Sequence, residues 1–270
     1  MSTNDVNHRP RKRFGQNFLH DTQIIDELIR CVDPRSGETF IEIGPGRGAL
    51  TLPLLEQDID LHAIEIDRDL AARWQNQAQR NPRFFVHCAD ALKVSLNDVL
   101  PGSERVRLIG NLPYNVSTPL LFRFVSWRDR LIDLHLMLQK EVVERMAAAP
   151  GNKTYGRLTV MLAPWFQIES LVHVGGEAFD PPPKVDSAFV RLTPHAAPPF
   201  QIDDTAAYRE IVTAAFSMRR KTLRNGLRAL LETDQIDACG IDPSARAETL
   251  APSEFAALAN ALVQHRKQMR

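Results

Sequence analysis

The sequence predicts an α/β domain built on a mostly parallel sheet with helices on both faces, followed by a small all-α domain. Three observations carry this prediction. From residue 39 onward, short apolar runs alternate with helical stretches; a glycine-rich turn directly follows the first run; and no strand-like run follows the proline-rich segment 193–199. Alternating strands and helices are typical of right-handed βαβ units. We therefore expect a first domain at residues 1–195 and a helical second domain at residues 196–270.

The spacing of apolar residues predicts each helix and strand in turn. Apolar residues recur at helical spacing over 22–32, which predicts a helix with Thr22 as its N-cap. Strands are predicted at 40–43, 61–66, 84–88, 106–109 and 131–138, with helices at 68–79 and 118–126 between them. The runs at 167–174 and 185–192 flank a proline-rich loop and predict a hairpin-like return. In the second domain we expect helices at 206–218, 222–231, 242–247 and 254–265.

Composition excludes several classes of protein. The 270 residues carry 33 Lys+Arg and 33 Asp+Glu, and 44% are hydrophobic, which excludes a wholly disordered chain. Cys31, Cys88 and Cys239 lie far apart without a C-x-x-C pair, so neither a disulfide framework nor a zinc site fits, and we expect no metal. Because no apolar run reaches the length of a membrane span and the basic N-terminus lacks a signal-peptide core, we expect a cytoplasmic protein without a membrane partner.

The glycine-rich turn and the acidic residues after the next two strands predict a nucleoside site. The segment Glu42–Gly48 (EIGPGRG) leads from a strand into a helix, and Gly44 and Gly46 allow a tight turn that a ligand can approach closely. Glu65, at the end of the second strand, can accept both hydroxyls of a ribose. Asp90, after the third strand, can reach an adenine edge. Either acid could instead be a helix N-cap, and for Asp90 alone that interpretation is the better one.

The charge next to the glycine-rich turn indicates which type of cofactor binds there. A dinucleotide places its diphosphate at a helix N-terminus and favours positive potential there. S-adenosylmethionine (SAM) presents a zwitterionic amino acid and a sulfonium cation, so an acidic residue ahead of the turn is tolerated. Glu42 therefore favours SAM over a dinucleotide.

A more specific motif, Asn111-Leu112-Pro113-Tyr114, follows the fourth strand. The amino group of adenine is a poor nucleophile because its lone pair is delocalised into the ring. The Asn111 side-chain oxygen and the Leu112 carbonyl can hold the two N–H bonds and localise that lone pair, while Pro113 restricts Leu112 to an extended conformation. Tyr114 offers an aromatic face on which a base can stack. The same tetrapeptide is also compatible with ordinary turn chemistry.

Together, these motifs and several others resemble the ribosomal RNA adenine dimethyltransferases of the small subunit. The resemblance runs from about residue 11 to residue 262 and is carried by six segments in this order: RKRFGQNFL (11–19), EIGPGRG (42–48), NLPYNVSTP (111–119), LQKE (138–141), FDPPPKVDS (179–187) and MRRKTLRN (218–225). It implies a seven-stranded, Rossmann-like SAM-dependent methyltransferase domain with a helical C-terminal domain.

The resemblance also implies a reaction and roles for residues. The reaction places two methyl groups on N6 of each of two adjacent adenosines near the 3′ end of small-subunit rRNA. Pre-30S particles would be the partner, and we expect a monomer. The remaining roles carried over are that Asn17 and Leu19 close over the cofactor and that Gly44 lines its methionine end. Asn111 would lie between the cofactor and the target amine and contact both, and Phe179 would be a second aromatic wall opposite Tyr114. Without the resemblance, Phe179 could equally be a core residue.

Two basic stretches are candidates for binding RNA phosphates. They comprise Arg219, Arg220, Lys221 and Arg224 in the second domain and Arg11, Lys12 and Arg13 near the N-terminus. A charge run is more often a solvated face, so this interpretation depends on the predicted methyltransferase site. The alternatives are a large-subunit rRNA dimethyltransferase, a dinucleotide-dependent oxidoreductase and a non-catalytic assembly factor.

Overall fold

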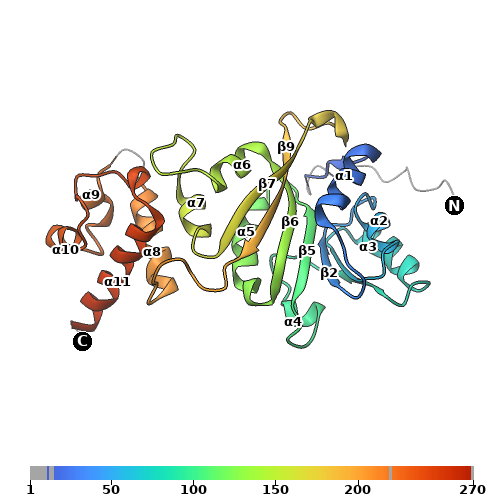
Figure 1. Ribbon diagram of the computed structural model, residues 1–270, viewed down its shortest axis with the longest axis horizontal. Helices are drawn as coiled ribbons and strands as arrows, with labels where there is room; N and C mark the ends of the chain where they lie inside the picture. Colours follow the sequence, from blue (N-terminus) through green and yellow to red (C-terminus); the bar gives the residue numbers. More distant parts are fainter. Residues whose placement is uncertain (1–10, 12–14, 219–220, 269–270) are drawn as a thin grey trace. The chain divides into compact units, whose positions relative to one another are not determined.

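The computed structural model describes residues 11, 15–218 and 221–268 (Figure 1). The chain forms two compact units. The first unit combines residues 1–143 and 168–194, and the second combines residues 144–167 and 195–270. The break after residue 194 lies next to the predicted domain boundary. Residues 144–167, in contrast, were assigned to the first domain but pack with the second unit. The Tyr155 hydroxyl donates to the Leu250 carbonyl (2.6 Å), and the Tyr208 hydroxyl donates to the Val160 carbonyl (2.9 Å).

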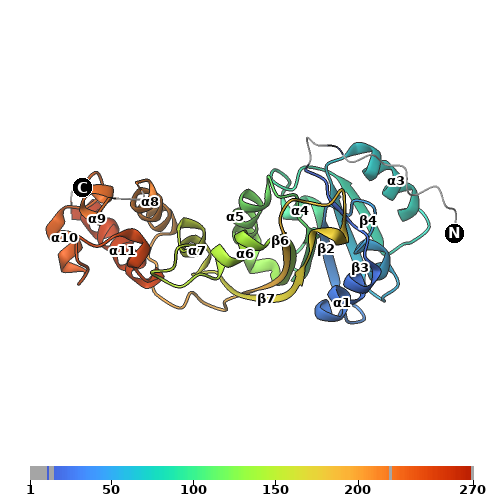
Figure 2. The ribbon, with the colours of Figure 1, turned by 90° about the horizontal axis from the view of Figure 1, so that it is seen from above.

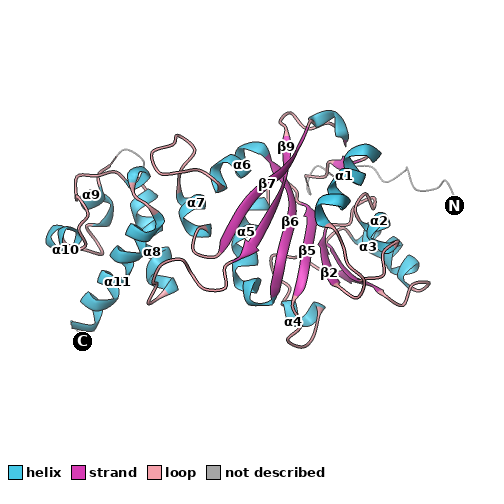
Figure 3. Cartoon of the chain, viewed as in Figure 1, coloured by secondary structure: helices cyan, strands magenta, loops and turns pink. Residues whose placement is uncertain are grey.

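A seven-stranded mixed sheet forms the centre of the first unit (Figure 3). Its strands are β2 (Thr39–Ile43), β3 (Asp60–Glu65), β4 (Phe84–Cys88), β5 (Val106–Asn111), β6 (Leu131–Gln139), β7 (Phe166–Val174) and β9 (Ser187–Pro194). In the order β4-β3-β2-β5-β6-β9-β7, the first five strands run parallel and β9 pairs antiparallel with β6. The predicted parallel sheet is therefore confirmed, and the two late strands are neighbours at its far edge. Because β2, β3, β4 and β5 are parallel, the segments that follow them meet at one edge.

Helices cover both faces of this sheet. The helices of this unit are α1 (Thr22–Val32), α2 (Thr51–Leu55), α3 (Arg68–Ala78), α4 (Leu96–Val99) and α5 (Ser117–Trp127), while α6 (Lys140–Met146) follows β6 and spans the division between the two units. Leu28 of α1, Leu54 of α2 and Trp74 of α3 share one apolar cluster with alternate strand residues. Figure 2 shows α5 on the face of the sheet opposite α1. A sheet covered on both faces explains why its strands are continuous apolar runs.

The N-cap of the first helix lies one residue earlier than predicted. Asp21, not Thr22, is the N-cap, and its carboxylate accepts hydrogen bonds from the backbone N–H groups of Gln23 and Ile24. Asp33 then ends the helix in the left-handed conformation, with φ of 49°. Both residues are the types that favour these special positions, so the sequence already contained this information.

The second unit is helical, but one of its predicted helices is too long and another is absent. Its helices are α7 (Arg157–Leu162), α8 (Thr205–Phe216), α9 (Leu223–Leu227), α10 (Thr233–Ala238) and α11 (Pro252–Gln268). The helix predicted at 222–231 is limited to α9. No helix forms at 242–247, because the Asp242 carboxylate accepts from both the backbone N–H and the hydroxyl of Ser244 and closes a turn.

Two strands of two residues each were not predicted from the sequence. β1 (Phe18–Leu19) pairs antiparallel with β8 (Phe179–Asp180), so that Phe18 lies opposite Asp180 and Leu19 lies opposite Phe179. Elements this short show no periodicity. Among the described residues, no helix is long and apolar enough to cross a membrane, and no group of three or more His, Cys, Asp or Glu side chains is placed to hold a metal ion.

Candidate functional site

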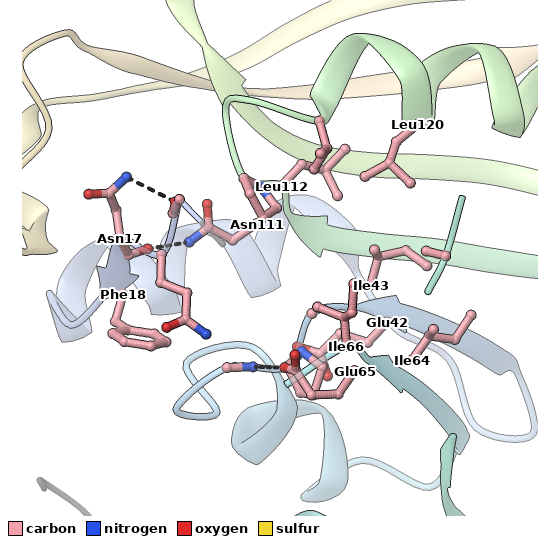
Figure 4. Close-up of a pocket in the computed structure, with 18 of the residues that line it drawn as sticks. Asn17, Phe18, Glu42, Ile43, Ile64, Glu65, Ile66, Asn111, Leu112 and Leu120 are labelled. Carbon is pink, nitrogen blue, oxygen red and sulfur yellow. Dashed lines mark hydrogen bonds between the residues drawn. The ribbon is translucent and has the colours of Figure 1, made fainter. Parts of the chain in front are cut away.

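A cavity of about 340 Å³ lies at the carboxyl ends of β2, β3 and β5 in the first unit (Figure 4). Ten of the predicted site residues line it: Asn17, Leu19, Gly44, Gly46, Glu65, Asp90, Asn111, Leu112, Pro113 and Tyr114. They come from the segment before α1 and from the segments that follow or end β2, β3, β4 and β5. The cavity has the size of a small-molecule site and is placed where open α/β sheets bind ligands.

The glycine loop is held by contacts with its backbone. Gly44 and Gly46 have φ of 70° and 54°, which a residue with a side chain rarely adopts. The Gly46 N–H donates to Oε2 of Glu65 (3.2 Å), and the Gly46 carbonyl accepts from the Trp74 indole N–H (2.9 Å). The loop is thus fixed between β3 and α3, and a ligand would meet it already in place.

Gly48 is the position in this loop where a side chain would be least tolerated. Its φ is 99°, and a Cβ there would lie 2.6 Å from the ring of Trp74, which is fully buried. We predict that Gly48→Ala destabilises the protein by about 2–4 kcal/mol, because Trp74 must shift and an alanine must adopt a disfavoured backbone conformation. Urea unfolding measures this loss. Gly102→Ala is the matched control, since Gly102 also has a positive φ (104°) but no atom within 4 Å of the added Cβ; an equal loss there would contradict the role of Trp74.

The two acids predicted after β3 and β4 have different surroundings. Glu65 is 4% exposed, and its Oε1 accepts from the Asp67 N–H (2.9 Å). Burial raises the pKa of Glu65, although the backbone N–H groups of Asp67 and Gly46 act in the opposite direction. Asp90 is half-buried, and its carboxylate accepts from the Leu92 N–H (3.0 Å). Both carboxylates are therefore fixed by backbone hydrogen bonds at the edge of the cavity.

Glu42 is an unusual carboxyl group in the cavity wall. It is 2% exposed, and within the described part of the chain its Oε2 has no hydrogen-bond partner. Burial raises the pKa of Glu42 to about 8; the Thr51 hydroxyl opposes this rise and the carboxylate of Glu65 adds to it. A buried carboxyl without a full set of partners is costly. A cation in the cavity would supply what this group lacks.

The Asn111 side chain is oriented by the segment before α1. Its Nδ2 donates to the backbone carbonyl of Asn17 (3.1 Å), across 94 positions of sequence. Figure 4 shows these two residues meeting at the cavity, with the amide oxygen of Asn111 directed away from the shared hydrogen bond. Because the donor side of the amide is used, the acceptor side remains for a ligand.

Phe179 does not line the cavity. It is 2% exposed and packs in the apolar cluster that includes Leu19 and Phe189. Phe179 thus has the buried surroundings of a core residue, which was the alternative that we considered, and its role as an aromatic wall opposite Tyr114 stays a prediction.

The predicted RNA-binding residues fall into three groups. Lys12, Arg13, Arg219 and Arg220 lie outside the described residues. Lys221 and Arg224 are exposed on the second unit. Arg11 forms ion pairs with Asp67 (2.8 Å) and Asp69, next to the first turn of α3.

One cluster beside the cavity was missed by the sequence analysis. The Arg47 guanidinium lies over the Phe18 ring (4.4 Å to its centroid) and pairs with Asp180 (2.7 Å). A Cβ on Gly46 would lie 3.1 Å from the same ring. Since Arg47 and Asp180 are 133 positions apart, no local pattern could have predicted their contact.

The fold and the site together define a class. The features that define it are a seven-stranded sheet in which β9 runs antiparallel to β6, a glycine loop after β2 and an acid at the end of β3, and they are those of the Rossmann-like methyltransferases. A model of the family "Ribosomal RNA adenine dimethylase" matches residues 7–264. The chain belongs to this family.

Individual relatives agree with this assignment. "Ribosomal RNA small subunit methyltransferase A" of Laribacter hongkongensis is 52% identical over 253 residues, which cover 94% of this chain and 96% of the relative. The solved structure of a dimethyladenosine transferase from Plasmodium falciparum has a TM-score of 0.75 at 25% identity and covers 93% of this chain and 98% of that one. The 23S rRNA methyltransferase ErmE has a TM-score of 0.69 at 25% identity and covers 92% of this chain and 100% of that one.

Proposed function

We propose that this protein dimethylates N6 of two adjacent adenosines near the 3′ end of small-subunit rRNA, with SAM as the methyl donor, during assembly of the small subunit in the cytoplasm. The observation that carries the proposal is the hydrogen bond from Asn111 to the Asn17 carbonyl, which uses the donor side of the amide and leaves its oxygen to accept from an amino group in the cavity. The donor would be bound and the target adenosine inserted at the same cavity, formed by the first unit.

The residues of the cavity fit SAM. Bound SAM supplies an electrophilic methyl group on a sulfonium. In the proposed complex, Glu65 would accept the ribose hydroxyls, Asp90 would contact the adenine edge, and the backbone of Gly44 and Gly46 would lie along the methionine part; all four residues line the cavity. The buried carboxyl of Glu42, with its unpartnered Oε2, suits a cationic ligand and is unsuited to a diphosphate, which is why we prefer SAM to a dinucleotide.

Methyl transfer to adenine needs alignment more than a strong base. Oδ1 of Asn111 and the carbonyl of Leu112 would hold the N–H bonds, localise the lone pair and aim it at the methyl carbon. The amine becomes acidic only after it carries the new methyl group, so its proton can then leave to water. In the second transfer only one N–H remains, and one of the two acceptors goes unused. The site must therefore have room around the amine.

A large-subunit rRNA substrate is the alternative. We prefer the small subunit because the relative with 52% identity is named for it, whereas the 23S rRNA enzyme shares 25% identity. The deciding experiment is mass spectrometry of 3′-terminal rRNA fragments after unmethylated small subunits are incubated with the protein and SAM. Addition of four methyl groups in two adjacent nucleotides supports the proposal. Methylation of large-subunit RNA alone would overturn it.

RNA binding by the second unit is a separate part of the proposal. We predict that Lys221→Glu with Arg224→Glu weakens binding to small-subunit rRNA about tenfold or more at low salt and reduces its salt dependence, because two phosphate contacts are lost. Filter binding over a range of salt concentrations measures both effects, and calorimetry checks that SAM affinity is unchanged. The matched control is Arg30→Glu with Arg80→Glu, at two exposed positions of the first unit. Equal loss of RNA and SAM binding in the Lys221/Arg224 variant would assign this stretch a structural role.

A further inference from the structure

The hydroxyl of Tyr114 forms a hydrogen bond with a serine far away in sequence. Ser187 Oγ lies 2.7 Å from the Tyr114 hydroxyl oxygen, and the two residues are 73 positions apart. Ser187 is the first residue of β9, pairs with Gln139 at the end of β6 and is fully buried. Its hydroxyl is therefore a fixed point supplied by the sheet, whereas Tyr114 lies in a loop and is half-buried at the cavity.

Tyr114 is fixed at both of its ends. At the backbone, the Ser117 hydroxyl donates to the Tyr114 carbonyl (3.2 Å), and the Val116 N–H donates to the Pro113 carbonyl (3.1 Å). At the far end of the ring, Ser187 holds the hydroxyl. A tyrosine ring has two rotatable side-chain bonds, and a partner for its hydroxyl restricts both of them. The plane of the ring is thus set before any ligand enters.

We propose that Ser187 is a positioning residue for the methyl-accepting nucleotide, acting through Tyr114 by holding its ring as a preformed stacking platform for the target adenine. This inference rests on the proposed function, in which an extruded adenine enters the cavity beside Asn111. The physical reason is that the free energy gained by stacking is not spent on ordering the ring when the ring is already ordered. The face of the ring, and not its hydroxyl, is then the part that contacts the base.

The hydrogen bond persists over the pH range in which such an enzyme works. Burial raises the pKa of the Tyr114 hydroxyl above its usual value of 10, the hydrogen bond from Ser187 acts against this rise and the carboxylate of Asp186 adds to it. The phenol therefore remains protonated, and the platform is not switched by pH in the neutral range. Any pH dependence of activity must come from another group.

The test is a double-mutant cycle on the complete protein, with unmethylated small ribosomal subunits and SAM as substrates. The variants are Ser187→Ala, Tyr114→Phe and their combination. The free energy of a neutral hydrogen bond of this kind corresponds to a change of about two- to tenfold in a rate or binding constant. We expect each single variant to lower kcat/KM for the ribosomal subunits by that factor and to leave KM for SAM unchanged. The double variant should be no worse than either single variant, because both remove the same bond.

Two further variants separate this inference from the proposed function and from simple destabilisation. Ser187→Thr keeps the hydroxyl and should retain most of the activity, while Ser126→Ala, on the exposed surface of α5, is the matched serine control. Three results would each overturn the role of Ser187. They are a double variant in which the two single effects multiply in full, an equal effect on KM for SAM, and single variants as active as the original protein. Full activity of Tyr114→Ala would instead overturn the proposed stacking role of Tyr114 itself.

Discussion

Replacing Asn111 by alanine is expected to slow methyl transfer by about 10²–10³ while leaving cofactor binding almost intact. In the structure the Asn111 amide donates to the Asn17 carbonyl (3.1 Å), so one hydrogen bond fixes the direction of the amide oxygen. Without that oxygen, the target amine loses one of the two acceptors that localise its lone pair. Loss of such a preorganised group costs about 10²–10³ in rate. Single-turnover methylation of small subunits with radiolabelled SAM measures the chemical step.

The controls for this variant follow from the same geometry. Asn76→Ala, on an exposed position of α3, should be fully active. SAM affinity of Asn111→Ala, measured by calorimetry, should stay within a few-fold of the original, because Glu65 and the glycine loop are unchanged. Asn111→Asp keeps an acceptor but loses the donor to Asn17, so we expect it to recover only part of the rate. A rate for Asn111→Ala within threefold of the original would refute the proposed alignment role.

The position of the cavity could be predicted from the sequence because it depends on local patterns. Apolar runs located the parallel strands, and a glycine or a polar side chain lies at or within two residues of the end of each run. The carboxyl ends of parallel strands lie at one edge of a sheet. A parallel order of these strands therefore brings Gly44, Glu65 and Asn111 together at that edge. The structure confirms the parallel order of these strands, and it places all three residues at the cavity.

What the sequence could not predict involves contacts between distant segments. The bond between Asn111 and Asn17, the ion pair between Arg47 and Asp180 and the bond between Tyr114 and Ser187 each join residues more than 70 positions apart. The packing of residues 144–167 with the second unit depends on Tyr155 and Val160, which no local signal assigns to one core or the other. The burial of Phe179 follows from its pairing with Leu19 in strands too short to show a pattern.

The buried Glu42 leads to a prediction about pH. Burial raises the pKa of Glu42 to about 8, so the group is protonated in the free protein at neutral pH. A cationic ligand would favour the ionised form and release the proton. We therefore expect SAM affinity to rise between pH 6 and pH 8, by up to about tenfold per pH unit, and to level off above pH 8. Calorimetry in buffers of different ionisation enthalpy measures the affinity and the released proton together.

The raised pKa of Glu42 also makes the stability of the ligand-free protein depend on pH. The folded protein binds this proton more tightly than the unfolded chain, in which the pKa is about 4.5. The contribution of Glu42 to the free energy of unfolding must therefore fall as the pH rises from about 4.5 to about 8, by up to about 1.4 kcal/mol per pH unit, and stay constant above that range. Urea unfolding at several pH values measures this dependence.

Glu42→Gln separates this group from all others that titrate, including the ligand. The variant should lose most of the pH dependence of both SAM affinity and stability between pH 5 and pH 8, and it should bind SAM more weakly than the original protein at pH 8. Glu56→Gln, at an exposed position just after α2, is the matched control and should behave like the original protein. If the Glu42→Gln variant keeps the full pH dependence of SAM binding, the cation does not act on this carboxyl group, and the proposed orientation of the donor in the cavity must be revised.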